Sequence, residues 1–246
     1  MTTRFAVLST TLATLALAGC SSSGSNPPPP EQSPLTYSAL RMQNGSSTTQ
    51  TGTGTISGSP QNTSVQVAGA TYNFTRSTGP DDTYSGIDAY AYPTSTNHDG
   101  AILYVGDYTR AALIADNTVN QQAVVVLNGN RTAPGSMPNQ TAIYDGLWSL
   151  SSSTGTGTAG QFIAGVDFDA RTYSMDFNDG NIPIGTGSGV IRGTGFTGNM
   201  TTQGALQSTN RVDGQFYGPG AAEMGGLIRG QSGNAATAGA LVGSKR

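Results

Sequence analysis

The chain has 246 residues and a formal net charge of −3, and only 10% of its residues are charged. It has no run of lysines and arginines to face a nucleic-acid backbone, which argues against nucleic-acid binding. The abundance of Gly, Ser, Thr and Asn disfavours helices and favours short strands joined by tight turns. Cys20 is the only cysteine, so no disulfide within the chain stabilises the fold.

Residues 1–19 have the pattern of a secretion signal. Arg4 precedes the apolar segment 5–18, which is shorter than the roughly 20 residues that span a bilayer. The segment ends in Leu17-Ala18-Gly19-Cys20, which resembles the bacterial lipobox. The resemblance implies cleavage before Cys20 and its acylation with fatty acids such as palmitate, which anchors a protein stably to a membrane. The alternative is an ordinary signal peptide followed by an incidental cysteine.

Residues 20–35 are expected to form a lipidated, disordered tether. They contain serines and four consecutive prolines, and they lack the apolar side chains that build a core. Ser21 follows the cysteine, where enteric lipoproteins of the inner membrane carry an aspartate. By that resemblance the expected location is the outer membrane. Whether the protein faces the exterior or the periplasm stays open at this point, with the exterior favoured.

Residues 36–132 are expected to form a smaller β-rich unit. Val65 and Val67, followed by Tyr72 and Phe74, predict a hairpin across Gly69. Two apolar runs, 101–105 and 123–127, predict buried strands, and the segment 110–116 fits either a strand or a short helix. The two prolines and the glycine of residues 131–138 predict a boundary at the end of this unit.

Residues 139–246 show clearer alternation of apolar and polar side chains. Apolar residues at 162, 164, 166 and 168, a turn at Ala170-Arg171, and apolar residues at 173, 175 and 177 predict a hairpin with one buried face. Further strands are predicted near 141–149, 187–193, 195–200, 211–218, 222–230 and 237–244. About eight antiparallel strands close a small barrel filled by its own side chains. The predicted fold class is therefore all-β, with an eight-stranded antiparallel barrel after the smaller unit.

The segment 212–230 reads VDGQFYGPGAAEMGGLIRG. It predicts a turn at residues 218–220 between two strands, with Phe216 facing inward beside Val212. Gly225 and Gly226 allow either a bulge or the close approach of another backbone.

The same segment resembles the terminal signature of the transferrin-binding-protein-B-like barrel family. The matching positions are Gly214, Phe216, Tyr217, Gly218, Pro219, Ala222 (or Ala221), Glu223, Gly225 and Gly226. The segment 144–148 resembles the first barrel strand of the family, 190–198 a later strand pair, and 243–245 the chain end. The signature concerns folding and names no ligand.

This resemblance implies a single lobe, in which a handle-like domain precedes the barrel. It implies a non-enzymatic, surface-exposed lipoprotein that binds an extracellular protein, such as an iron carrier of the transferrin type, for nutrient uptake. Surface-export machinery and a TonB-dependent receptor are the further partners implied. Full transferrin-binding proteins have two lobes, and the length for only one weakens the assignment to transferrin. The alternatives are a haem-binding surface lipoprotein and a structural envelope lipoprotein without a specific ligand.

Candidate chemistry is sparse. His98 is the only histidine, which excludes a two-histidine zinc site, and it has no nucleophile-elbow sequence around it. Asp167 and Asp169 are predicted to share a strand face, with Asp176 opposite, as an acid–base pair or calcium ligands. A solvated hairpin face is the favoured alternative, and residues 176–180 are predicted to be a turn. No enzymatic or metal site is expected.

Aromatic residues give the one candidate ligand site. Tyrosines cluster within 25 residues around His98, namely Tyr84, Tyr90, Tyr92, Tyr104 and Tyr108. Tyrosine is enriched in protein-binding surfaces, and tyrosine and histidine are possible axial ligands of haem. A protein partner is favoured over haem. The alternative is that these tyrosines belong to ordinary half-exposed strands.

Overall fold

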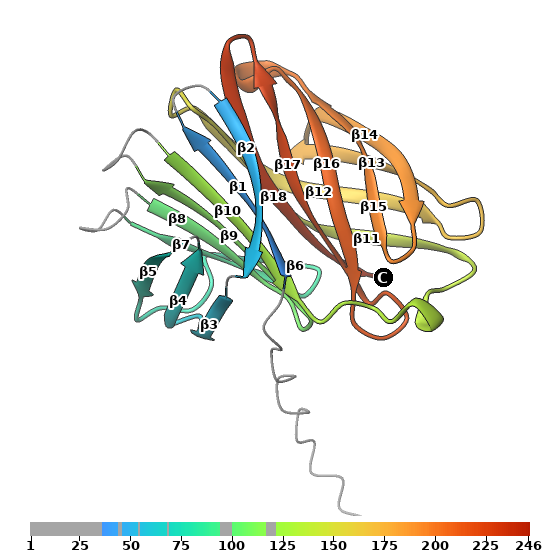
Figure 1. Cartoon of the computed structure of the whole chain (residues 1–246). Coiled ribbons are helices and arrows are strands. Elements are labelled where there is room, and N and C mark those ends of the chain that lie inside the picture. The colour runs from blue at the N-terminus through green and yellow to red at the C-terminus, as the bar shows by residue number, and fades with distance from the viewer. Residues whose placement is uncertain (1–35, 44–45, 54, 68, 94–99, 117–121) are drawn as a thin grey trace, which may run out of the picture.

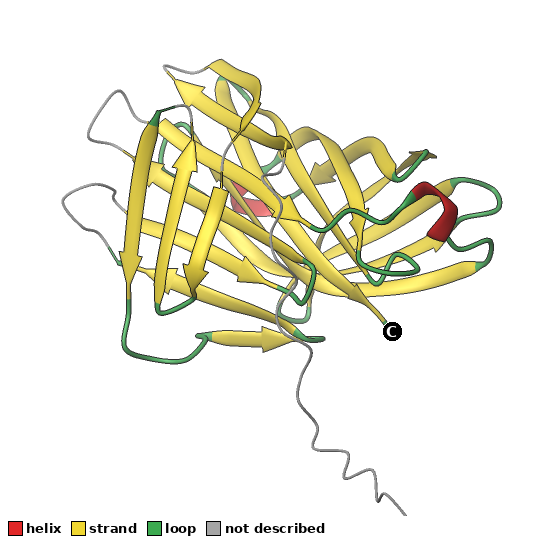
Figure 2. Ribbon diagram, turned by 60° about the horizontal axis from the view of Figure 1, so that its bottom comes forward, coloured by secondary structure: helices red, strands yellow, loops and turns green. Residues whose placement is uncertain are grey.

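The computed structural model describes residues 36–43, 46–53, 55–67, 69–93, 100–116 and 122–246. The predicted signal, the tether with Cys20, and His98 lie outside these residues. The described chain is almost entirely β strand, with two short 3₁₀ helices, η1 (Pro134–Ser136) and η2 (Gly204–Leu206) (Figure 2). The prediction of an all-β fold is confirmed. No helix in the described part of the chain has the length and apolar character needed to cross a membrane.

Eight antiparallel strands of the C-terminal half close into a barrel in chain order (Figure 1). They are β11 (Thr141–Ser152), β12 (Gly157–Asp167), β13 (Thr172–Asp179), β14 (Ile182–Arg192), β15 (Gly195–Thr202), β16 (Ser208–Tyr217), β17 (Glu223–Ser232) and β18 (Ala235–Lys245). Closure occurs where β18 pairs with β11, with Leu241 opposite Trp148. The predicted number of barrel strands is confirmed, and so is the hairpin formed by β12 and β13.

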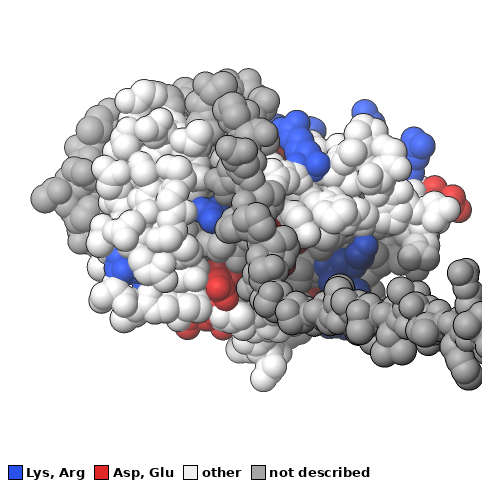
Figure 3. Space-filling view, turned by 90° about the horizontal axis from the view of Figure 1, so that it is seen from below, with Lys and Arg blue, Asp and Glu red and all other residues white. Residues whose placement is uncertain are grey.

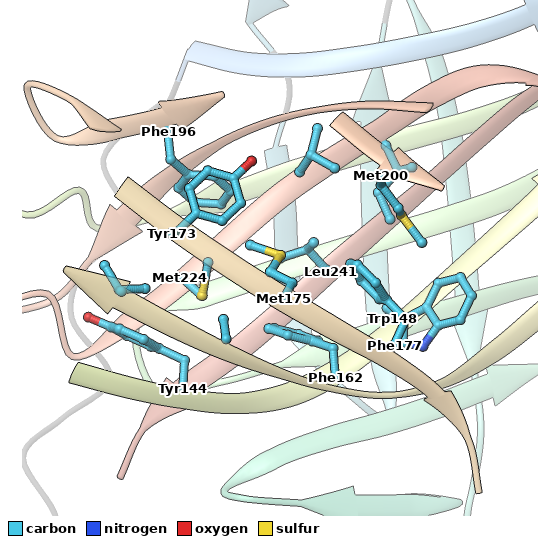
Figure 4. Packing of buried hydrophobic residues seen from close by; sticks show 14 of the residues in the cluster. Tyr144, Trp148, Phe162, Tyr173, Met175, Phe177, Phe196, Met200, Met224 and Leu241 are labelled. Atoms are coloured by element: carbon cyan, nitrogen blue, oxygen red, sulfur yellow. The ribbon is translucent and has the colours of Figure 1, made fainter. Parts of the chain in front are cut away.

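Aromatic side chains fill the barrel interior (Figure 4). Trp148 meets Phe177 edge-on, with ring centroids 5.2 Å apart, and Tyr173 meets Phe196 in the same way at 5.3 Å. Phe196 in turn lies 5.4 Å from Phe216. Such rings bury large apolar areas and prefer these tilted geometries, so the interior is a packed core without room for a channel.

Inward-facing glycines make room for these rings. A Cβ atom at Gly214 would lie 2.1 Å from the ring of Phe196, a distance that no packed side chain adopts. Gly226, on the neighbouring strand, also faces the Phe196 ring, at 3.4 Å. The glycines of the signature therefore set the shape of the core as well as the path of the backbone.

Two further sheets come from the N-terminal half. The first has seven strands in the order β2-β1-β10-β9-β8-β7-β6 and the second has three in the order β3-β4-β5. The strands are β1 (Thr36–Gln43), β2 (Ser46–Thr53), β3 (Thr55–Ser59), β4 (Asn62–Val67), β5 (Ala70–Thr75), β6 (Asp82–Tyr84), β7 (Ile87–Tyr92), β8 (Gly100–Val105), β9 (Thr109–Asp116) and β10 (Gln122–Gly129). The predicted hairpin across Gly69 is β4–β5, and the ambiguous segment 110–116 lies in strand β9.

The strands β7 to β10 of the seven-stranded sheet contribute buried side chains to both of its faces. One face, with Leu113 and Val125, packs on the outside of the barrel against Leu227 and Val242, and alanines of β18 keep this contact close. The other face packs against the three-stranded sheet through a separate apolar cluster that includes Ile114. Because both faces are covered, β8 to β10 read as continuous apolar runs in the sequence.

Candidate functional site

The predicted tyrosine cluster is divided between the two faces of the seven-stranded sheet. Tyr90 and Tyr92 lie in the apolar cluster under the three-stranded sheet and are 5% and 4% exposed. Tyr104 lies on the barrel side and is 3% exposed, with Tyr84 and Tyr108 partly buried beside it. The five tyrosines therefore do not share one surface. Their role in ligand binding stays a prediction, and His98 lies outside the described residues.

Arg76 lies over the rings of two of these tyrosines. Its guanidinium lies 5.5 Å from the ring centre of Tyr90 and 5.8 Å from that of Tyr92. It also donates hydrogen bonds to Asp81, at 2.6 Å, and to the backbone oxygen of Ala91, at 3.0 Å. The hydrogen bond from Arg76 is the main reason that the pKa of Asp81 falls to about 2. These contacts fix the connection between β5 and β7.

Burial also limits what these tyrosines do as ligands. The hydroxyl of Tyr92 donates to the backbone oxygen of Pro60 at 2.6 Å. Burial raises the pKa of Tyr90 and of Tyr92, which disfavours the phenolate form that binds haem iron. In the described structure, both side chains therefore support the joint between the two sheets.

The family signature forms the joint between the barrel and the seven-stranded sheet. The carboxylate of Glu223, the first residue of β17, accepts hydrogen bonds from the backbone N–H groups of Asp107, at 2.7 Å, and Tyr108, at 3.1 Å. Gly106 precedes this pair, and a Cβ atom there would lie 2.6 Å from the carboxylate. Glu223 is only 3% exposed, so it joins the β8–β9 turn to the barrel from inside the interface.

Glycines of the signature let the two units approach closely. A Cβ atom at Gly225 would lie 2.8 Å from Leu127 Cδ1 and 2.9 Å from Thr109 Cγ2, both on the seven-stranded sheet. Gly218 similarly lies against the ring of Tyr108. The unbroken register of β17 with both neighbours excludes a bulge at Gly225, and the atoms that approach this glycine belong to side chains rather than to another backbone. The signature therefore docks the seven-stranded sheet in addition to forming the barrel.

The environment of Glu223 favours its neutral form. Burial raises the pKa of this carboxyl, and the backbone N–H donors of Tyr108 and Asp107 offset part of the rise. Sequence reasoning included Glu223 only as a motif position. The available signal was a single acidic residue at the start of the otherwise uncharged run EMGGLI.

The predicted acidic face on the β12–β13 hairpin is wrong. Asp167 ends β12 opposite Thr172, whereas Asp169 lies in the following turn, so the two do not share a strand face. Asp176 pairs with Ile163. The turn begins one residue after Asp167, whose carboxylate accepts the N–H of Ala170 at 2.8 Å. No group of three or more potential metal-ligating side chains occurs among the described residues.

An apolar crevice of about 460 Å³ lies between the seven-stranded sheet and the barrel. Tyr92, Ile102 and Leu113 border it on the sheet side and Leu150 on the barrel side. Tyr92 is the only member of the predicted tyrosine set that borders the crevice.

Comparisons with known proteins agree with this architecture. Residues 137–246 match the family model of the C-lobe and N-lobe β-barrels of Tf-binding protein B. No curated protein matches the chain. The barrel formed by residues 137–246 belongs to this family of transferrin-binding protein B barrels.

Solved structures extend the likeness beyond the barrel. Transferrin-binding protein B from Neisseria meningitidis serogroup B has a TM-score of 0.60 and 16% identity, covering 86% of this chain and 43% of the other. A double mutant of transferrin-binding protein B from Haemophilus parasuis has a TM-score of 0.58 and 20% identity, and the match covers 85% of this chain and 45% of the other. This chain thus spans less than half the length of those proteins. A mutant of transferrin-binding protein B from Actinobacillus pleuropneumoniae has a TM-score of 0.51 and 18% identity. This match covers 87% of this chain and 100% of the other. At these identities the matches show a shared fold.

Proposed function

We propose that this protein is a non-enzymatic lipoprotein of the outer membrane that captures an extracellular protein, of the transferrin type, at the cell surface. In this proposal residues 1–19 are removed, Cys20 is acylated, and residues 20–35 hold a handle-like domain (36–132) and a barrel domain (139–246) away from the membrane. Surface-export machinery and a TonB-dependent receptor are the partners in export and uptake.

The observation that carries the proposal is the combination of a transferrin-binding protein B barrel with a fold that follows such proteins over 85–86% of this chain. The lipobox at Cys20 independently supports a membrane anchor. The interior of the barrel supports a binding role over a transport role, because aromatic rings fill it.

Localisation is tested by expressing the full chain and its Cys20→Ser variant in a Gram-negative host with surface-lipoprotein export. We expect the parent protein in the outer-membrane fraction and its digestion by protease on intact cells. The Cys20→Ser variant is expected to leave the membrane fraction. A parent protein that resists protease on intact cells, yet is digested after lysis, would contradict surface exposure.

Ligand capture is tested with purified full-length protein immobilised on a sensor. Iron-loaded and iron-free transferrins from several mammals are passed over it, with serum albumin as the matched control. We expect saturable binding of at least one transferrin and none of albumin. Absence of binding to every transferrin would refute the assignment of this ligand type.

A further inference from the structure

Arginines gather on the outer wall of the barrel, although they are far apart in the sequence. Four of the eleven basic residues line two neighbouring hollows, of about 350 and 730 Å³, namely Arg131, Arg192, Arg211 and Arg229. Arg211 borders both hollows, and the two together are called the arginine groove. Figure 3 shows several Lys and Arg side chains on the barrel side of the face seen from below.

The groove contains an unfavourable charge pairing. Arg211 on β16 and Arg229 on β17 are direct cross-strand partners, and like charges in that position destabilise a sheet. Asp213 partly compensates, because it accepts hydrogen bonds from Arg211 Nε, at 2.9 Å, and from Arg229 Nη2, at 3.3 Å. Burial disfavours the charged form of Asp213, but hydrogen bonds from Thr197 and Arg211 and the charge of Arg229 hold its pKa below the ordinary value.

One carboxylate does not neutralise the three guanidinium groups of Arg192, Arg211 and Arg229. Asp213 is the one acidic side chain among the described residues that line the two hollows, which leaves an excess of two positive charges among these four side chains. The side chain of Arg192 is exposed and makes no hydrogen bond or ion pair with any described residue. Arg211 uses two of its five N–H donors on Asp213 and Thr197. The groove therefore keeps donors and charge available for an anion, in a chain with a net charge of −3.

The strand register gives the length of the groove. Arg131 forms a bridge with Tyr217, at one end of β16, and Arg211 lies six residues away on the same strand. Arg192 pairs with Gly195, which lies beside Gln215. At about 3.3 Å per residue the positive charges extend over roughly 20 Å along β16. That length suits an extended peptide of about six residues better than a single small anion.

We propose that the arginine groove is a docking site for an extended acidic segment of a protein partner. Guanidinium groups bind carboxylates through paired hydrogen bonds, and a row of them selects a row of acidic side chains. Complementary charge of this kind accelerates encounter and sets orientation. The docking proposal does not depend on transferrin being the ligand, because a protein that captures no transferrin can still bind an acidic segment in the arginine groove.

The test uses fluorescein-labelled hexaglutamate and the full-length protein in 50 mM NaCl, with binding followed by fluorescence anisotropy. We expect saturable binding that weakens as salt increases, and no binding of labelled hexalysine. The Arg192→Gln variant should bind hexaglutamate about 3- to 5-fold more weakly, and the Arg192→Gln/Arg211→Gln variant about 10-fold more weakly. Lys245→Gln removes one exposed charge outside the groove and should change affinity less than about 2-fold.

Arg192 gives the decisive comparison because it makes no contact that the fold needs, and an unchanged thermal unfolding midpoint verifies folding. Failure of the parent protein to bind hexaglutamate would overturn the proposal. So would equal losses in the Arg192→Gln and Lys245→Gln variants. Inorganic phosphate is titrated separately by calorimetry, and an affinity equal to that of hexaglutamate would overturn the requirement for an extended segment.

Discussion

At the scale of single residues, two carboxylates with opposite pKa shifts stabilise the two joints of the fold. Glu223 is buried between the barrel and the β8–β9 turn, and its pKa is raised. Asp81 lies at the surface beside Arg76, and its pKa is lowered to about 2. The difference arises because burial dominates at Glu223, whereas a hydrogen-bonded guanidinium dominates at Asp81.

Glu223 is expected to make stability fall as pH rises. Its folded-state pKa lies above the ordinary 4.5, so its contribution is fully present below about 4.5 and is lost as pH rises through the raised value. Replacing it with glutamine should remove this dependence. The measurement is the free energy of unfolding in urea for both proteins at several pH values between 4 and 7. Parallel curves for the parent and Glu223→Gln would contradict the prediction.

Asp81 is expected to make stability fall as pH falls, which is the opposite of the effect of Glu223. Its pKa is lowered, so its contribution is present above about 4 and is lost as pH falls through about 2. Carbon-13 NMR of the carboxyl group should give a midpoint near 2 in the parent protein. In the Arg76→Ala variant the midpoint should rise toward 3.8, because the hydrogen bond is gone. A parent midpoint near 4 would show that the ion pair does not form in solution.

At the scale of elements, close packing of β17 against the seven-stranded sheet depends on the absence of a side chain. Gly225 faces that sheet, where Leu127 and Thr109 leave no room for a Cβ atom. Gly165 on β12 also faces outward, yet the atom nearest to its Cβ position is Ser174 Oγ at an ordinary 3.6 Å. The two glycines therefore differ in the space around them, although both lie within strands.

Gly225→Val is expected to lower the free energy of unfolding by about 3 kcal/mol, because the valine forces the sheet away from the barrel. Gly165→Val, the matched control, should change it by less than about 0.5 kcal/mol, because a surface strand position accepts valine. Urea unfolding of both variants measures the difference. Equal losses would show that strand glycines matter for a reason other than docking.

At the scale of the whole molecule, the barrel has an apolar outer wall that the seven-stranded sheet covers. Leu147, Tyr217, Leu227 and Val242 are all buried on that outer face. A soluble monomer rarely exposes a contiguous apolar patch of that kind. The barrel and the sheet are therefore expected to depend on each other for solubility.

Residues 137–246 produced alone are accordingly expected to self-associate and to bind a hydrophobic dye. Replacing Leu147 and Leu227 with serine should reduce both effects, because these side chains lie on the uncovered wall. Size-exclusion chromatography and dye fluorescence provide the measurements, with the full chain as reference. A monomeric isolated barrel without dye binding would show that the sheet is not needed to cover this wall.

The sequence determined the parts of this protein that follow from local pattern. Alternating side chains such as Phe162, Ala164 and Val166 define strands because side chains on a strand point to opposite faces. The barrel strands, the hairpin across Gly69 and the terminal signature were therefore all predictable. The segment 110–116 was ambiguous, because a strand buried on both faces has the same apolar run as a short helix.

Only the tertiary structure decided which side chains lie next to one another in space. The tyrosines at 84–108 are close in sequence but divide between two faces, because the strand register pairs Tyr104 with Ala89 on the barrel side, whereas Tyr90 pairs with Leu103 on the other face. Conversely, Arg192, Arg211 and Arg229 are about 18 residues apart, and strand pairing gathers them in one groove. Glu223 joins the β8–β9 turn, more than a hundred residues earlier in the chain. The physical reason is that strand register and sheet packing, which sequence spacing does not specify, place these side chains side by side.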